Sequence, residues 1–168
     1  MTTDSDAKGV ALGPDQAGFI TGPVSINVAS CDLNLVPSVT RAFGCRASVD
    51  RREITVFLST PRSADVLRDI RAGAMVAVVF SRPSTHRTLQ LKGRDARIMP
   101  LARGDRALMI AYGAAFSTEI RDLGYPELFA GGLASGVDDD AVALVFTPCA
   151  AFEQTPGPLA GQALVAGR

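Results

Sequence analysis

Residues 53–98 carry the most regular hydrophobic pattern in the chain, and this pattern is typical of a strand, a short helix and two further strands. Ile54 to Leu58 is rich in β-branched and aromatic residues, as strands are. Met75 to Phe80 is a continuous apolar run, too short to span a bilayer and typical of a strand buried on both faces. From Thr88 onward, polar and apolar residues alternate, which predicts a strand with one polar face.

A short helix is expected between the first two of these strands. Ser63 is a favourable N-cap, Leu67 and Ile70 lie three positions apart on one helical face, and Gly73 is a favourable stop. The first strand therefore leads almost directly into a helix.

Polar residues cluster where that strand ends and the helix begins: Ser59, Thr60, Arg62 and Ser63. Hydroxyl groups, a guanidinium and the amides of a helix N-terminus together favour an anion, most commonly a phosphate. Gln90, on a nearby strand, can both donate and accept hydrogen bonds. A simpler interpretation stays open, in which Ser63 only caps the helix and Arg62 is solvated.

The order of these elements, with the motifs Phe57-Leu58-Ser59-Thr60, Arg62-Ser63 and Arg87 to Gly93, resembles the flavin-binding split barrels of the pyridoxamine 5′-phosphate oxidase-like superfamily. The resemblance covers about Gly22 to Gly161. It implies an α+β fold, a six-stranded antiparallel split β-barrel with peripheral helices. It also implies a homodimer with FMN in the cleft at the subunit interface, the phosphate being held by Arg, Lys and Ser/Thr side chains.

Matched residue by residue, the resemblance implies a set of cofactor-binding positions. These are Arg41, Ser59, Thr60, Arg62, Ser63, Thr88, Gln90 and Lys92. Residues 59–63 fall on the segment that binds the phosphate and ribityl chain, and Thr88 and Gln90 on the strand that reaches the flavin. Arg41 resembles the arginine that follows a proline on the second strand. Arg41 or Lys92 could stabilise the reduced, anionic flavin, while apolar residues such as Val36 and Phe57 could form the slot for the ring.

The resemblance implies an FMN-dependent oxidoreductase acting on a small molecule, with NAD(P)H as one candidate reductant. True pyridoxine phosphate oxidases end in an Arg-x-His motif within a Trp-containing segment. This chain has no Trp and ends in Leu164 to Arg168, so the substrate half of that site is absent. A second class remains open: a non-catalytic flavin- or haem-binding carrier, store or sensor. For haem, His86 is the only imidazole in the chain.

Composition argues against several other classes. Lys and Arg number 17 and Asp and Glu also 17, a balance that does not favour a nucleic-acid partner. No run of about 20 apolar residues could span a membrane, and residues 1–6 lack the apolar core of a secretory signal. The three cysteines lack metal-ligand spacing and fit the reduced thiols of a cytoplasmic protein. His86 lacks an orienting partner for catalysis, and the consecutive Asp138 to Asp140 do not converge on one ion.

The rest of the chain predicts a single domain over residues 19–168, preceded by a mobile tail over residues 1–18. The expected elements are a strand at Val24 to Val28, a second strand from Leu35 to Val49 interrupted at Gly44, a long amphipathic helix from Arg103 to Leu123, and a last strand at Ala141 to Thr147. Residues 152–158 form a stiff polar loop that could line a ligand cleft or only close the fold.

Overall fold

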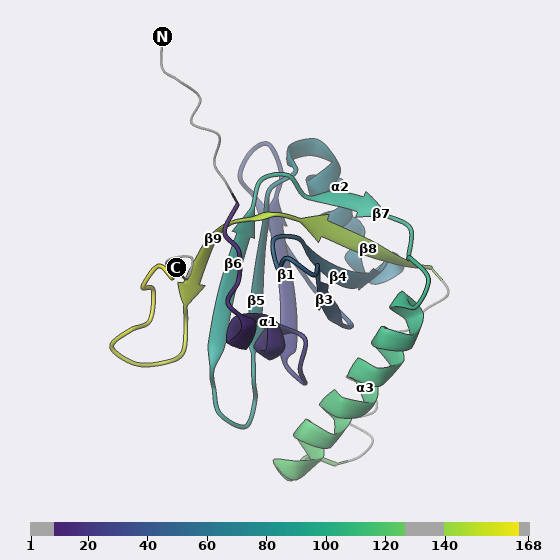
Figure 1. The fold of residues 1–168 in the computed structure, drawn as a ribbon. Helices are drawn as coiled ribbons and strands as arrows, with labels where there is room; N and C mark the ends of the chain where they lie inside the picture. The colour runs from purple at the N-terminus through teal and green to yellow at the C-terminus, as the bar shows by residue number, and fades with distance from the viewer. Residues whose placement is uncertain (1–8, 127–139, 165–168) are drawn as a thin grey trace.

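A computed structural model describes residues 9–126 and 140–164 of the chain. Along them the elements are α1 (Pro14–Ile20), β1 (Ser25–Cys31), β2 (Pro37–Arg41), β3 (Cys45–Ala47), β4 (Ile54–Ser59), the 3₁₀ turn η1 (Pro61–Ser63), α2 (Ala64–Gly73), β5 (Val76–Ser81), β6 (Thr88–Gly93), β7 (Arg97–Met99), α3 (Asp105–Asp122), β8 (Ala141–Phe146) and β9 (Pro148–Glu153). Figure 1 shows the strands stacked at the centre, with α3 on one flank.

The described strands form two antiparallel sheets, one in the order β2-β1-β5-β6-β9 and the other in the order β3-β4-β8-β7. The predicted α+β class with antiparallel sheets is confirmed. The predicted single barrel of six strands differs from this arrangement, which divides nine described strands between a five-stranded and a four-stranded sheet. The chain passes between the sheets four times, once through η1 and α2 and three times through short connections at residues 42–44, 94–96 and 147. The count differs because each short connection splits a run of extended chain into two strands.

The first of these passages corrects one predicted strand. The run from Leu35 to Val49 is not one bulged strand but two strands, β2 and β3, in different sheets. Gly44 lies between them with a φ of 131°, in a region that other residues avoid. A Cβ atom at this position would lie 3.0 Å from Cδ2 of Phe57. Glycine therefore allows both the turn and the close approach of the backbone to that ring.

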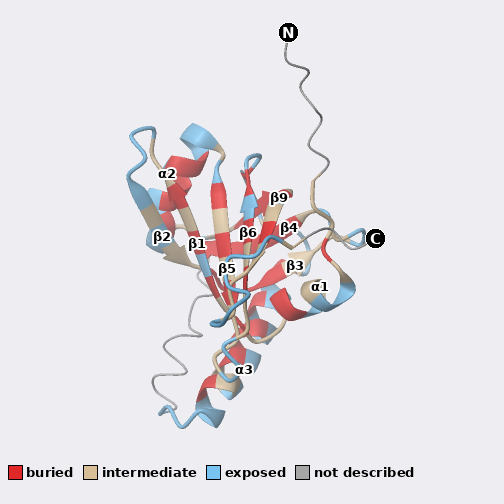
Figure 2. Cartoon of the chain, turned by 90° about the vertical axis from the view of Figure 1, so that its left-hand side faces the viewer, coloured by how far each residue is buried: buried red, intermediate tan, exposed pale blue. Residues whose placement is uncertain are grey.

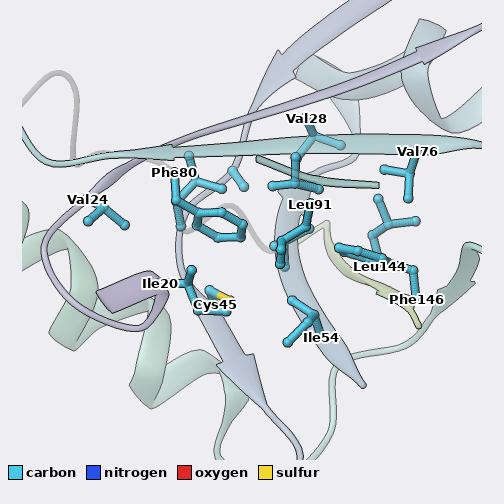
Figure 3. Packing of buried hydrophobic residues seen from close by; sticks show 14 of the residues in the cluster. Ile20, Val24, Val28, Cys45, Ile54, Val76, Phe80, Leu91, Leu144 and Phe146 are labelled. Atoms are coloured by element: carbon cyan, nitrogen blue, oxygen red, sulfur yellow. The ribbon is translucent and has the colours of Figure 1, made fainter. Parts of the chain in front are cut away.

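The main hydrophobic core lies between the facing sides of the two sheets (Figure 3). Val28, Phe80 and Leu91 come from the five-stranded sheet, while Ile54 and Phe146 come from the four-stranded sheet, and all are fully buried. Figure 2 shows the buried residues concentrated where the sheets meet. Burying a side chain of this size stabilises a fold by roughly 1.5–3 kcal/mol, so this interface holds the two sheets together.

The apolar sequence of β5 predicted a strand buried on both faces, but only one face of β5 is buried. Val76, Val78 and Phe80 are buried, whereas Ala77 and Val79, which alternate with them, are only half-buried. Successive strand residues point to opposite sides of a sheet. Only one face of β5 therefore belongs to the core, and the composition of a strand does not distinguish this case from a fully buried one.

Residues 9–18, expected to belong to a mobile tail, are part of the fold. Leu12 is buried, and its N–H donates to the carbonyl of Arg51 at 3.0 Å. Helix α1 starts with Pro14 at its first position, and the Gln16 side chain accepts a hydrogen bond from the preceding Gly13 N–H at 2.9 Å. Proline at the first helical position is a common helix start, and the sequence interpretation overlooked it.

The predicted long helix and last strand are present as α3 and β8. Strand β9 was not predicted, because Pro148 to Ala151 begins with proline and lacks β-branched residues. Residues 127–139, with most of the acidic run at 138–140, lie outside the described part. Within that part, no three His, Cys, Asp or Glu side chains are grouped closely enough to hold a metal ion. No described helix has the length and hydropathy to cross a membrane.

Candidate functional site

The end of β4 meets the start of α2 through the short 3₁₀ turn η1, and β2 runs beside this point. We call Thr40, Ser59, Thr60, Arg62 and Ser63 the β4–α2 junction. Ser59 is fully buried, and the Thr60 N–H donates to the carbonyl of Asp140 at 3.1 Å. Ser59, Thr60, Arg62 and Ser63 follow one another through this turn, and Thr40 of β2, which the sequence did not single out, contacts Arg62 and Ser63.

Ser63 occupies the N-cap position of α2, as predicted, but its hydroxyl makes no capping bond to a helix amide. Its Oγ instead lies 3.0 Å from Oγ1 of Thr40, and that Thr40 hydroxyl also lies within 3.2 Å of the Arg62 carbonyl, to which it donates. Ser63 is only 2% exposed. The hydroxyl therefore ties the start of the helix to β2, a role beyond that of a simple cap.

The guanidinium of Arg62 lies at the surface of the junction, with its carbon 5.8 Å from the centre of the Phe43 ring. Phe43 belongs to a small buried cluster with Phe57 and Met109. A cation within about 6 Å of an aromatic face is attracted to it. The junction thus combines one cationic fork with hydroxyl groups at a helix start, a donor set that suits a phosphate.

Two carboxylates of α2 lie near this helix start, and both pair with Arg68. Asp65 accepts from Arg68 Nη1 at 2.6 Å, and Asp69 forms an ion pair with Arg68 Nη2 at 3.0 Å. Asp69 also accepts from the Ser38 hydroxyl at 2.6 Å. The Ser38 bond, with help from Arg68, holds the pKa of Asp69 below its ordinary value although burial acts in the opposite direction. The acidic groups are therefore already paired and oppose a bound anion less than free carboxylates would.

Arg41 lies on the other side of β2 from Thr40. Its guanidinium donates to the Ser25 hydroxyl at 3.2 Å and to the Tyr112 hydroxyl at 3.3 Å, and its carbon lies 4.6 Å from the centre of the Phe116 ring. Neighbouring strand residues point to opposite faces, so Arg41 and the junction flank β2 from different sides. The structure does not bring Arg41 to residues 59–63.

Arg41 instead shares a face with the predicted residues of β6. The directly paired residues Arg41, Asn27, Val79, Gln90 and Phe152 form one row across the five-stranded sheet. Directly opposed residues in antiparallel strands project to the same side. Three strand spacings separate β2 from β6, about 14 Å in all, given about 4.8 Å between neighbours.

Thr88, Gln90 and Lys92 lie together on this face of β6, as their alternation predicted. Gln154 Nε2 donates to Gln90 Oε1 at 3.3 Å, and the Lys92 ammonium lies 5.2 Å from the centre of the Phe152 ring. Both partners come from β9 and the residue just after it. The first two residues of the loop predicted at 152–158 are therefore the end of β9, and they lie beside predicted site residues.

A cavity of about 500 Å³ opens next to Lys92 and Phe152, over β1, β5, β6 and β9. Its wall is mainly apolar, with Lys92 and Arg94 as the charged groups and Cys31 and Cys149 among the lining residues. Small-molecule pockets usually have volumes of about 300–1,000 Å³ and apolar walls with a few polar groups. No sequence pattern marked this cavity, because its walls come from four separate strands.

The eight predicted residues thus form two groups on opposite sides of β2. The junction carries the hydroxyls and Arg62, while the open face of the five-stranded sheet carries Arg41, Thr88, Gln90 and Lys92. The first group suits an anionic head and the second suits the polar edge of a ring beside an apolar surface.

No protein-family model matches this sequence, and no curated protein matches it. Solved structures do match the fold. One is a candidate pyridoxamine 5′-phosphate oxidase from Lactobacillus delbrueckii, with a TM-score of 0.53 and 14% identity over 90% of this chain and 99% of that one. Another is HupZ from Group A Streptococcus, with a TM-score of 0.54 and 17% identity over 89% of this chain and 99% of that one.

At these identities the likeness concerns the fold alone. The resemblance inferred from the sequence motifs is confirmed at that level: the chain has the fold of pyridoxamine 5′-phosphate oxidase-like proteins.

Proposed function

We propose that this protein binds FMN and that the β4–α2 junction holds the FMN phosphate. The observation that carries the proposal is the position of the Arg62 guanidinium, which lies at the surface of a helix start that the Thr40–Ser63 contact fixes to β2. Arg62 can present a charge-assisted fork to phosphate oxygens. Thr60 adds a hydroxyl at the same helix start. A phosphate monoester would pair with the Arg62 charge better than a neutral group would.

The pyrimidine edge of the flavin would meet the open face of the five-stranded sheet. Gln90 offers both a donor and an acceptor there, and Lys92 and Arg41 offer positive charge. Because the two groups of residues lie on opposite sides of β2, we assign them to two subunits of a homodimer, with FMN in the cleft between them. This arrangement matches the one implied by the sequence resemblance.

Exposed apolar side chains support a homodimer. The turn between β1 and β2 carries Leu33, Leu35 and Val36, which are 81%, 72% and 59% exposed, and Val39 of β2 is 71% exposed. Val39 shares a face with Ala29 and lies on an edge strand. Apolar residues gathered at a sheet edge favour burial against a second copy in an isologous interface.

The chemistry we propose is that of a flavin-dependent oxidoreductase acting on a small molecule, with NAD(P)H as the candidate reductant. Bound FMN would supply hydride transfer, so no protein nucleophile is required. The role of the chain is then to hold the phosphate, to exclude water from the ring and to place Lys92 or Arg41 near the edge that becomes negative on reduction. All three cysteines are unpaired thiols, which supports a reducing compartment such as the cytoplasm.

The absorption spectrum of the purified protein, before and after incubation with FMN, tests the binding proposal. Flavin bands that survive gel filtration, followed by bleaching with NADH or NADPH, are expected. Flavin bands without bleaching by either reductant would favour the carrier or sensor alternative. A Soret band after incubation with haem, with no retained flavin, would contradict the proposal, and a monomer in light scattering would contradict the shared cleft.

A further inference from the structure

A second cavity, of about 540 Å³, lies between α1, β3 and α3, and we call it the α1–α3 cavity. In Figure 1 the two helices lie on either side of β3. Its lining includes Gly18, Arg46, Arg51, Leu108, Ala111 and Tyr112. None of the residues assigned above to FMN lines it, so it is a separate site.

Small side chains on both helices create this space. Ala17 and Gly18 face it from α1, while Ala111 and Ala115 face it from α3, one helical turn apart. A Cβ atom added to Gly18 would have no neighbour within 4 Å. The helices therefore leave a gap that larger residues could fill without strain. Its volume falls in the range of about 300–1,000 Å³ that small-molecule pockets occupy.

Arg46 enters the cavity wall from β3 and is held by a buried carboxylate. Its Nε donates to Asp105 Oδ1 at 2.8 Å, and the other Asp105 oxygen accepts from the Ala102 N–H at 2.8 Å. Asp105 is only 2% exposed. Among the described residues, no acceptor contacts the Nη groups of Arg46. The ion pair fixes the orientation of the guanidinium and leaves these donors for another group.

Arg51 lies in the turn after β3 with a φ of 57°, a left-handed conformation that is strained for a residue with a side chain. It is held there by Leu12: its Nε donates to the Leu12 carbonyl at 2.8 Å, and its own carbonyl accepts from the Leu12 N–H at 3.0 Å. Asp50, the adjacent acid, is bonded to the Ser48 hydroxyl and the Arg52 N–H. No described carboxylate pairs with Arg51, so the cavity wall carries an uncompensated positive charge.

We propose that the α1–α3 cavity binds an amphipathic anion. The apolar body lies between Leu108, the alanines of α3 and the ring of Tyr112, and a carboxylate or phosphate head accepts hydrogen bonds from Nη groups of Arg46 and Arg51. Guanidinium forks bind both kinds of head group. A neutral ligand of the same shape would leave these donors unpaired and would bind more weakly.

Titration of the full-length protein with anilinonaphthalene sulfonate tests the site, because this probe joins an aromatic body to one anionic group. Gly18→Leu should fill the cavity and weaken probe binding at least about tenfold. Arg51→Gln removes one charge-assisted contact and should weaken it by about tenfold as well. Gly73→Leu and Arg71→Gln, at exposed positions of α2 outside the cavity, serve as matched controls and should leave binding unchanged. Circular dichroism checks that each variant is folded. If the Gly18→Leu protein does not fold, Ala115→Leu is used instead, because it fills the cavity from the other helix.

Competition separates this site from the flavin site. Decanoate should displace the probe, decanol should displace it at least about tenfold less well, and FMN should not compete. Equal displacement by decanoate and decanol would overturn the anionic character of the site. Unchanged probe binding in folded Gly18→Leu and Arg51→Gln proteins, or stoichiometric displacement by FMN, would overturn the site itself. Loss of FMN binding with intact probe binding would refute only the proposed function.

Discussion

The hydroxyl groups of Thr40 and Ser63 lie 3.0 Å apart although 23 positions of sequence separate the two residues. Through this contact, the helix start is attached to an edge strand of the five-stranded sheet. A hydroxyl at an N-cap more commonly bonds to the helix itself. Its use here makes the geometry of the junction depend on both elements at once.

Thr40→Val should therefore lower the free energy of unfolding by about 1–3 kcal/mol, because it leaves the buried Ser63 hydroxyl without its partner. The double variant Thr40→Val with Ser63→Ala removes both hydroxyls and should recover part of that loss. Urea denaturation of the two variants measures the difference. Equal stability of the wild type and the Thr40→Val protein would mean that Ser63 has another partner, such as a helix amide.

Arg62→Ala should weaken FMN binding by about 1.5–3 kcal/mol, the scale of a hydrogen bond to a charged group. Arg62→Lys should recover only part of the affinity, because it replaces a bidentate fork with a point charge. Arg71→Ala, on the exposed side of α2, is the control and should bind FMN normally. Isothermal titration of the apoproteins gives the dissociation constants, and an unchanged value for Arg62→Ala would exclude Arg62 from the phosphate site.

FMN should bind at least about 100-fold more tightly than riboflavin, a difference of roughly 2.7 kcal/mol, since riboflavin lacks the phosphate. The preference should shrink in Arg62→Ala and should fall as salt concentration rises. Flavin fluorescence reports both titrations. Equal affinities for the two ligands would mean that the β4–α2 junction is only a helix start.

Thr55→Val should stabilise the protein by about 1 kcal/mol, in contrast to the same exchange at Thr40. Thr55 is 1% exposed, and its hydroxyl has no hydrogen-bond partner among the described residues. Burying an unpaired hydroxyl is costly, and valine has nearly the same shape. Thermal denaturation gives the comparison. A lower melting temperature for Thr55→Val would show that the hydroxyl does have a partner in solution.

Stability should fall above pH 10 because of Tyr112. Burial raises the pKa of this phenol from its ordinary value of 10.0 to about 12, against a smaller opposing effect of Arg41. Between these values the unfolded chain releases the proton while the native chain keeps it, so unfolding becomes more favourable as pH rises. Urea midpoints measured across this range should decline less steeply for Tyr112→Phe than for the wild type. Parallel declines would assign the effect to other groups.

Local sequence patterns correctly predicted the helices and strands whose type depends mainly on residues close to them in the sequence. The periodicity at Ile54 to Leu58 and from Arg103 to Leu123 was sufficient, because strand and helix formation follow from that pattern. The separation of β2 from β3 was not predictable in this way. Both halves have strand-like composition, and only their partners in space differ. Gly44 indicated an interruption of the strand, but the surrounding sequence did not show that the chain changes sheets there.

In the candidate site too, some positions follow from local sequence and others depend on contacts between distant parts of the chain. Residues 59–63 were expected to gather because they are consecutive at a strand end. The position of Arg41 depends instead on Tyr112 and Phe116 of α3, and no local pattern links these residues to β2. The α1–α3 cavity was not predictable from the sequence either, because it arises from small residues on two helices that are far apart in the chain.

The pairing of β8 has a consequence for how the protein is made. In the four-stranded sheet β8 lies between β4 and β7, and Ile54 pairs with Phe146, which is 92 positions later in the chain. A nascent chain on the ribosome therefore carries β4, whose six residues are all buried in the finished fold, with one edge unpaired until residues 141–146 have emerged. Its other edge pairs with β3, which is made before it. Such long-range pairing slows folding and exposes intermediates to aggregation. Until β8 is made, this edge of β4 is therefore open to chaperones and to other chains.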